Sequence, residues 1–222
     1  MFDALFTTTT EYKKLSHALS GKGACALFGL PASGRAQVYA ALCRQLDKPL
    51  CIVTPGEAEA TRFAADLNTL GIPAAVFPAR DYVLRPIEGT AREYEYRRLA
   101  VLGELVGGRL RAVAVPAEAL TQFTTPKEDF CANTRTLHAG DTLLRDDLLA
   151  ALFGAGYTRR AQVDGPGQFS VRGDIVDIFA PDQKMPVRME FWGDEIDTLH
   201  TFDLTTQRRE DAIDKFYLSP AR

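Results

Sequence analysis

The clearest pattern in the chain is an alternation of apolar and polar residues toward its C-terminal end. Three runs carry it, at residues 169–179, 187–191 and 196–202, and turn-forming residues such as Gly193 and Asp194 separate them. A period of two buries one face of a strand and exposes the other. The short links leave no room for crossover helices. The pattern therefore predicts an antiparallel β-meander with one polar face.

The polar face of this meander is a candidate binding surface. Arg172, Arg188, Glu190 and Arg208 are predicted to lie on it, close to Phe179, which ends the first run. Protein interfaces concentrate their binding energy in arginine and aromatic residues. An arginine on a rigid sheet can also pair bidentately with a carboxylate of a partner. These are the residue types that a docking surface would use.

Strand-length and helix-length segments alternate in the first half of the chain. In chain order, the pattern predicts a helix at 11–19, a strand at 24–28, a helix at 35–46, a strand at 50–53, a helix at 57–70, a strand at 74–77, a helix at 91–106, a strand at 111–115 and a short helix at 116–123. This alternation is typical of a parallel sheet covered by helices. The predicted fold class is α/β, with a parallel-sheet domain at residues 1–125 and a small α+β domain containing the meander at residues 126–210.

The loop after the first predicted strand has the glycine spacing of a phosphate-binding P-loop, GxxxxGK[ST]. Gly29 and Gly34 occupy the glycine positions, and Ser33 precedes the second glycine. Arg35 replaces the lysine, however, and Ala36 replaces the hydroxyl residue that would hold Mg²⁺. A planar guanidinium substitutes poorly for a compact ammonium, and alanine cannot ligate a metal. We expect a degenerate, non-functional loop, no cofactor and no ATP hydrolysis by this chain.

Three consecutive pieces of the chain, FSVRGDIVDIFAP, PVRMEFWGDEIDTLHTFD and TTQRR, resemble a small domain shared by two families of bacterial repair proteins. These are UvrB, the damage-loading helicase of nucleotide excision repair, and the transcription-repair coupling factors (Mfd). In both families the domain docks UvrA, the damage-recognition ATPase. The resemblance implies that UvrA is a partner of this chain and that the docking residues are Arg159, Arg172, Phe179, Arg188 and Arg208.

Residues 1–125 resemble the first domain of UvrB through the order of elements and the segments RLAVLGEL and VAVPAEAL. UvrB has an intact P-loop and a DNA-gripping β-hairpin, and the coupling factors have lost both. Here the P-loop lysine is missing. Roughly 13 residues separate the predicted 74–77 strand from the predicted 91–106 helix, and this is too few for a long hairpin and its connections. The resemblance therefore favours the N-terminal UvrB-like region of a coupling factor.

This resemblance also implies that the chain is a fragment of a longer protein. Residues 211–222 would begin a return segment to the first domain, cut short. The full-length protein would be an ATP-dependent DNA translocase with RNA polymerase and double-stranded DNA as further partners.

Simpler structural roles remain open for the candidate docking residues. Arg172 could form a turn-stabilising pair with Asp174, and Arg159, like its neighbour Arg160, could lie in a solvated loop. Phe179 could belong to the core. Trp192 follows the second run, and at such a turn a tryptophan is more often a core residue than a binding residue.

Two other functions compete with protein docking. The chain could be part of a UvrB-like, ATP-dependent DNA helicase whose P-loop tolerates Arg35. Residues 1–125 could instead bind DNA nonspecifically through a group of arginines that acidic residues interrupt, namely Arg80, Arg85, Arg92, Arg97 and Arg98. The net charge of −3 and a pI near 5.7 argue against a DNA-binding surface that covers the whole fold.

The remaining composition is that of a globular protein of the cytoplasm. Apolar residues make up 46% and charged residues 25% of the chain. No apolar run approaches a membrane span, and the N-terminal residues lack the basic start of a signal peptide. The four cysteines show no CxxC spacing, so we expect buried free thiols in a reducing compartment and no metal site.

Overall fold

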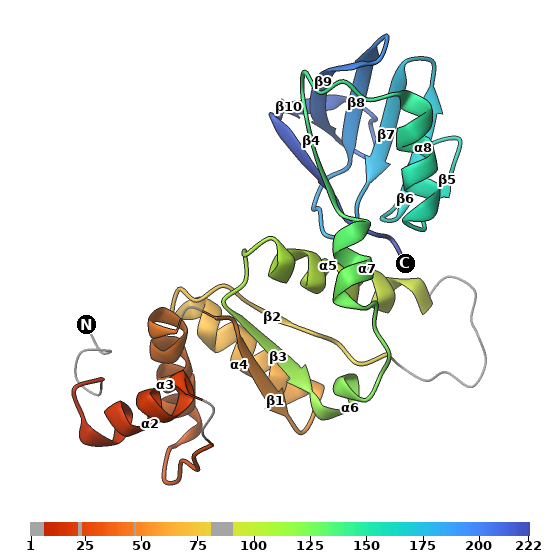
Figure 1. Cartoon of the computed structure of the whole chain (residues 1–222). Helices are drawn as coiled ribbons and strands as arrows, with labels where there is room; N and C mark the ends of the chain where they lie inside the picture. Colours follow the sequence, from red (N-terminus) through yellow and green to blue (C-terminus); the bar gives the residue numbers. More distant parts are fainter. Residues whose placement is uncertain (1–6, 22–23, 47, 81–90) are drawn as a thin grey trace. The chain divides into compact units, whose positions relative to one another are not determined.

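The computed structural model describes residues 7–21, 24–46, 48–80 and 91–222 (Figure 1). The chain divides into two compact units. Unit 1 comprises Met1–Ala79 and Gly107–Gln122, and unit 2 comprises Arg80–Val106 and Phe123–Arg222. The segment that contains the predicted 91–106 helix therefore makes its contacts with unit 2, whereas the sequence placed it in the first domain.

Unit 1 contains a three-stranded parallel sheet in the order β1-β3-β2, which confirms the predicted parallel sheet. Helices α3 and α4 supply its core, because Ala40 and Phe63 pack with Ile52 and Ala112 of the strands. The elements of this unit are α2 (Thr10–Ser20), α3 (Ala32–Gln45), β1 (Leu50–Thr54), α4 (Glu57–Thr69), β2 (Ala74–Val76), β3 (Ala112–Pro116) and α6 (Ala117–Leu120).

The strand predicted at residues 24–28 does not form. This segment has no regular backbone pairing, and the side chains of Leu27 and Phe28 are 46% and 88% exposed. The sheet ends at β1 and at β2, so the segment adds no strand to either edge and its backbone groups have no ladder partner. A short apolar run is ambiguous by periodicity alone, which explains why this prediction was wrong.

Unit 2 is built on a six-stranded sheet in the order β10-β9-β8-β7-β6-β5 (Figure 1). All neighbouring strands are antiparallel except β5 and β6, which confirms the predicted meander. The elements of this unit are α5 (Ala91–Val106), α7 (Lys127–Ala132), β4 (Arg135–His138), α8 (Arg145–Gly154), β5 (Thr158–Arg159), β6 (Gln168–Arg172), β7 (Ile175–Phe179), β8 (Val187–Trp192), β9 (Glu195–Phe202), β10 (Arg209–Ala212) and β11 (Lys215–Leu218).

The first alternating run, residues 169–179, is a β-hairpin rather than one strand. Gly173 has a φ of 61° and, with Asp174, forms the two-residue turn between β6 and β7. Glycine adopts this left-handed backbone without steric cost. The alternation of apolar and polar residues continues through Gly173 and Asp174, so the hydrophobic pattern alone did not reveal the turn.

One face of the meander packs against α8. Leu148 and Leu152 of this helix are fully buried against sheet residues that include Phe169, Val176 and Met189. Residues two apart along a strand share a face, so the intervening side chains project from the opposite side. This arrangement leaves the predicted polar face on the side away from α8.

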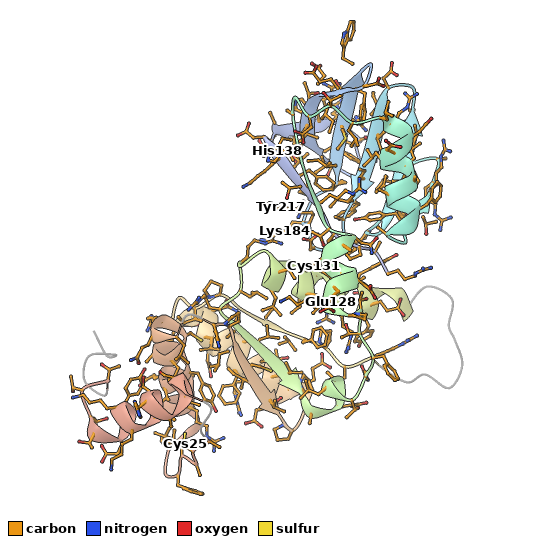
Figure 2. The ribbon with its side chains drawn as sticks, viewed as in Figure 1. Cys25, Glu128, Cys131, His138, Lys184 and Tyr217 are labelled. Carbon is orange, nitrogen blue, oxygen red and sulfur yellow. The ribbon has the colours of Figure 1, made fainter. Side chains whose placement is uncertain are left out.

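The C-terminal segment completes unit 2. β11 pairs antiparallel with β4, and Figure 2 labels His138 and Tyr217 on these two strands. The amide of Ala221 donates to the carbonyl of Ala155 at 2.8 Å, and Phe216 is 2% exposed. Residues 215–221 therefore fold with unit 2, where the sequence suggested the start of a return segment to the first domain.

Two predictions from the sequence concern the cysteines and membrane-spanning segments. All four cysteines are free, but only Cys43 is buried, so the prediction of buried thiols was wrong for Cys25, Cys51 and Cys131. Cys25 lies in the segment that forms no strand, Cys51 lies on the edge strand β1, and Cys131 lies on helix α7. Among the residues that the structure describes, no helix combines the length and the apolar content needed to cross a membrane.

Replacing Met189 by alanine tests the assignment of the core. Met189 is fully buried in unit 2, so the Met189→Ala variant is expected to lower the free energy of unfolding by about 2–5 kcal/mol. Urea denaturation followed by circular dichroism measures the change. Phe123 is fully exposed, and the control variant Phe123→Ala is expected to stay within about 0.5 kcal/mol of the wild type. Equal losses in the two variants would contradict this core.

Candidate functional site

The strand register of unit 2 brings polar residues from distant positions into two rows on the face away from α8. One row contains Ser170, Asp177, Arg188 and His200, in successive strands from β6 to β9. The next row contains Arg172, Ile175, Glu190 and Thr198. We call this surface the polar face.

Asp177 holds the two candidate arginines of the polar face together. Its carboxylate is 1% exposed and accepts hydrogen bonds from Nε and Nη2 of Arg188 at 2.7 and 2.9 Å. The same carboxylate accepts a hydrogen bond from Nη2 of Arg172 at 2.6 Å. The bonds from Asp177 raise the pKa of Arg188, whereas burial of the guanidinium opposes this effect. Two guanidinium groups therefore share one buried carboxylate.

The loop at residues 203–208 covers part of the polar face. The carbonyl of Gln207 accepts a hydrogen bond from Nη1 of Arg188 at 3.1 Å, and the Arg188 guanidinium lies 4.7 Å from the ring centroid of Phe202. Asp203 shapes the loop by accepting the Thr206 amide at 2.7 Å, and this bond lowers the pKa of Asp203. Arg188 is only 9% exposed as a result. Its role is therefore to hold Asp177 within the sheet and not to contact a partner.

Phe179 is a core residue and not an exposed anchor. It is 7% exposed and packs with Val163, Phe202 and Leu204 in a small second cluster on the polar face. The prediction of an exposed aromatic at this position was therefore wrong. The cause is the covering loop, which the local alternation of β7 does not indicate.

Arg172 remains available at the surface. Its side chain is 47% exposed, and its described hydrogen bond uses only one of the three guanidinium nitrogens. The alternative pairing with Asp174 was wrong, because Asp174 accepts a hydrogen bond from Arg145 of α8 at 2.9 Å. The geometry leaves Arg172 able to donate further hydrogen bonds to a partner.

The other two candidate arginines lie at opposite edges of the sheet. Arg159 is on the edge strand β5, and Arg208 precedes the edge strand β10. Both are exposed, and five strand spacings separate their strands by about 24 Å. Arg159 is paired with Phe169 and so projects toward the α8 side, whereas the alternation of the strand brings Arg160 to the side of the polar face.

A pocket of about 460 Å³ lies beside β5 in unit 2, and Arg160 and Gln168 line it with Tyr96 and Arg97 of α5. Gly167 has a φ of 72°, and a Cβ at this position would lie 2.5 Å from the hydroxyl of Tyr96. Only glycine fits this combination of backbone and close contact. Glu93 also lines the pocket, so the pocket beside the edge strand β5 contains both basic and acidic residues.

The degenerate P-loop does not have the geometry of a phosphate-binding loop. Helix α3 begins at Ala32, so Ser33, Gly34 and Arg35 lie in its first turn. The amides of Gly34 and Arg35 both donate to the carbonyl of Pro31, at 3.0 and 3.1 Å. Ala36 is 3% exposed. Amides already bonded within the helix cannot form the nest that cradles phosphate in a P-loop.

The arginines considered for DNA binding do not form an open basic patch among the described residues. Arg80 pairs with Glu95 at 3.5 Å, Arg97 lies over the ring of Tyr94 at 5.7 Å, and Arg98 is 6% exposed. Arg85 and the side chain of Arg92 lie outside the described residues.

Sequence reasoning missed two residues of this surface. Asp177 was not singled out, although it is the one acidic residue between buried positions of the 169–179 run, and this placement could have marked it. Trp192 was expected in the core but is 83% exposed. The sequence around Trp192 does not indicate whether its side chain is buried or exposed, because this depends on which segment packs beside the β8–β9 turn.

Comparison with known proteins shows which proteins this chain is similar to. Residues 136–222 match the model of the UvrB interaction domain. The chain is 38% identical over 192 residues to the transcription-repair-coupling factor of Mycobacterium bovis and 34% identical over 205 residues to that of Myxococcus xanthus. It is 28% identical over 198 residues to that of Bacillus subtilis. These matches cover 83–88% of this chain.

The predicted resemblance to transcription-repair coupling factors is confirmed. The chain spans only 15–17% of the length of these curated relatives. The matched segment runs from the second residue of β4 through β11 and therefore includes the whole polar face.

Removing the shared carboxylate tests how the polar face is held together. The Asp177→Ala variant leaves Arg188 buried without its ion pair, so we expect a loss of about 3–5 kcal/mol in the free energy of unfolding. Arg172 is half-exposed, and Arg172→Ala is expected to cost less than about 1 kcal/mol. Urea denaturation of both variants measures the difference. A loss in Asp177→Ala no larger than in Arg172→Ala would show that the buried pair does not stabilise the sheet.

Proposed function

We propose that residues 136–222 dock the repair protein UvrA through the polar face and thereby recruit it to transcription-coupled DNA repair. The observation that carries the proposal is the half-exposed Arg172, held by a buried carboxylate, within a segment that matches the UvrB interaction domain. The open guanidinium nitrogens of Arg172 are the primary contact, and Arg160 and Arg208 form the rim, whereas Arg159 projects to the α8 side.

The arrangement favours an acidic partner surface. The single negative charge of Asp177 neutralises one of the two guanidinium groups bonded to it. The group formed by Asp177, Arg172 and Arg188 therefore carries one surplus positive charge. The bond to Asp177 also restricts Arg172 before any partner binds. Restricting a long side chain in advance reduces the conformational entropy lost on binding. A carboxylate of UvrA is therefore the expected partner of Arg172.

The chain acts in this proposal as a binding module and not as an enzyme. Arg35 and Ala36 replace the lysine and the metal-holding hydroxyl residue of a P-loop, and the amides of Gly34 and Arg35 are bonded within α3. RNA polymerase and double-stranded DNA are proposed as partners of the longer protein, through regions outside these 222 residues. The rival function, an ATP-dependent helicase fragment, requires nucleotide binding by this chain.

Reversing the charge at Arg172 is expected to weaken UvrA binding. The Arg172→Glu variant places a carboxylate where the partner presents one, and a lost charged contact at an interface centre corresponds to a drop of about tenfold or more in affinity. Calorimetric titration of residues 1–222 with purified UvrA measures the affinity.

Arg135→Glu is the matched control, because Arg135 is an exposed arginine on β4, outside the polar face. Its affinity is expected to equal that of the wild type. Undiminished binding by Arg172→Glu, with the fold intact by circular dichroism, would refute the central role of Arg172.

The chain is expected to show no micromolar affinity for Mg-ATP in calorimetry. The double variant Arg35→Lys, Ala36→Ser restores the residue types of a P-loop, but we expect it to remain inactive. The reason is the early start of α3, which commits the amides of Gly34 and Arg35 to Pro31. Micromolar binding by the wild type would support the helicase function, and binding by the double variant alone would show that chemistry rather than backbone geometry was lost.

A further inference from the structure

Trp192 is the single tryptophan of the chain and ends β8 at its turn into β9. Its side chain is 83% exposed. The residues 188, 190 and 192 alternate with the buried positions of β8, so Trp192 projects on the same side as the polar face. A large aromatic side chain left in solvent on a strand of a paired sheet is the kind of residue that interfaces use as an anchor.

Two acidic residues belong to the same turn as Trp192. Glu195 is the cross-strand partner of Trp192, so both side chains lie on one face, and Asp194 occupies the turn between them. Both acidic side chains are exposed, and neither forms an ion pair with any residue that the structure describes. An electron-rich ring next to carboxylates attracts a cation through the ring quadrupole and through charge.

The turn that carries these residues is braced by a second segment of backbone. The amide of Leu143 donates to the carbonyl of Asp194 at 2.7 Å, and the amide of Ile196 donates to the carbonyl of Asp141 at 2.9 Å. Thr142 forms an isolated bridge with Glu195. The turn is therefore held in one conformation before binding, which lowers the entropy cost of docking.

Asp194 and Glu195 give the turn itself a negative charge. Arg209, a cation that lies against the same face of β8, pairs with Glu190 and not with either of these carboxylates. The charge at the turn is thus opposite in sign to the charge at Arg172, and a basic side chain complements it.

We propose that Trp192, Asp194 and Glu195 form a second docking point, which takes an arginine or lysine side chain of UvrA. This inference rests on the proposed docking function. Trp192 and Arg172 lie two strands apart on the same face, about 10 Å across the sheet, so one partner surface of ordinary size covers both. UvrA then presents a carboxylate to Arg172 and a cation to Trp192, and this charge pattern specifies the orientation of the complex.

Variants at position 192 separate a cation–π contact from simple hydrophobic contact. Trp192→Leu keeps an apolar side chain without a ring and is expected to weaken UvrA binding about tenfold, whereas Trp192→Phe keeps a ring and loses about threefold. The double variant Asp194→Asn, Glu195→Gln is expected to weaken binding and to reduce its salt dependence. The control Phe123→Ala removes another exposed aromatic residue and is expected to bind like the wild type.

Three outcomes of this calorimetric titration would overturn the proposal: wild-type affinity in Trp192→Leu, equal losses in the Leu and Phe variants, or wild-type affinity in the Asn/Gln double variant. All three residues are exposed, so substitutions at these positions are not expected to unfold the protein and thereby lower its affinity for UvrA. The midpoint of the unfolding transition, measured for each variant, checks this.

A second measurement keeps the failure of this site distinct from the failure of UvrA docking as a whole. The fluorescence of Trp192 reports on this position alone, and a short oligoarginine peptide contains no fluorophore. We expect a saturable fluorescence change with this peptide, none with a glycine-serine peptide, and none with the Asn/Gln double variant. Absence of the change in the wild type would overturn the cation site, even if UvrA binds. A clear change in a chain that fails to bind UvrA would retain the cation site and refute the docking function.

Discussion

The polar face of unit 2 depends on one buried carboxylate, that of Asp177. Removing a carboxylate from water is costly, and the cost is offset only when its oxygens accept several charged hydrogen bonds. Arg188 supplies two of these bonds and Arg172 a third. Asp177 and Arg188 are also paired in register across β7 and β8. A slip of one residue would carry the carboxylate into the core on the α8 side, so this pair specifies the register as well as the surface.

The same pair divides the polar face into a closed end and an open end. At the closed end the 203–208 loop covers Arg188, and Phe179 and Phe202 form a dry cluster beneath it. At the open end Arg172 and Trp192 remain exposed. Protein interfaces favour exposed arginine and tryptophan side chains that stand on a rigid, buried layer. The buried interactions at the closed end therefore organise the surface that is left for a partner at the open end.

The loop at residues 29–36 of unit 1 is committed to local helical structure. The predicted parallel sheet and helices form, but the strand predicted before the loop does not, and α3 begins early enough to use the loop amides itself. Phosphate binding at a P-loop needs these amides unpaired and pointing inward. Arg35 and Ala36 also stand where a P-loop has a lysine and a hydroxyl residue.

The sequence by itself determined the parallel sheet, the antiparallel meander and the resemblance to the coupling factors, because these depend on periodicity and short motifs that are local in the chain. Tertiary structure decided the rest. Phe179 and Trp192 both end alternating strands, yet a covering loop buries one and the other stays in solvent. Arg188 and Arg172 look equivalent along the chain, yet only Arg172 can reach a partner. Exposure of a side chain depends on which distant segment packs over it, and local alternation contains no information about that segment.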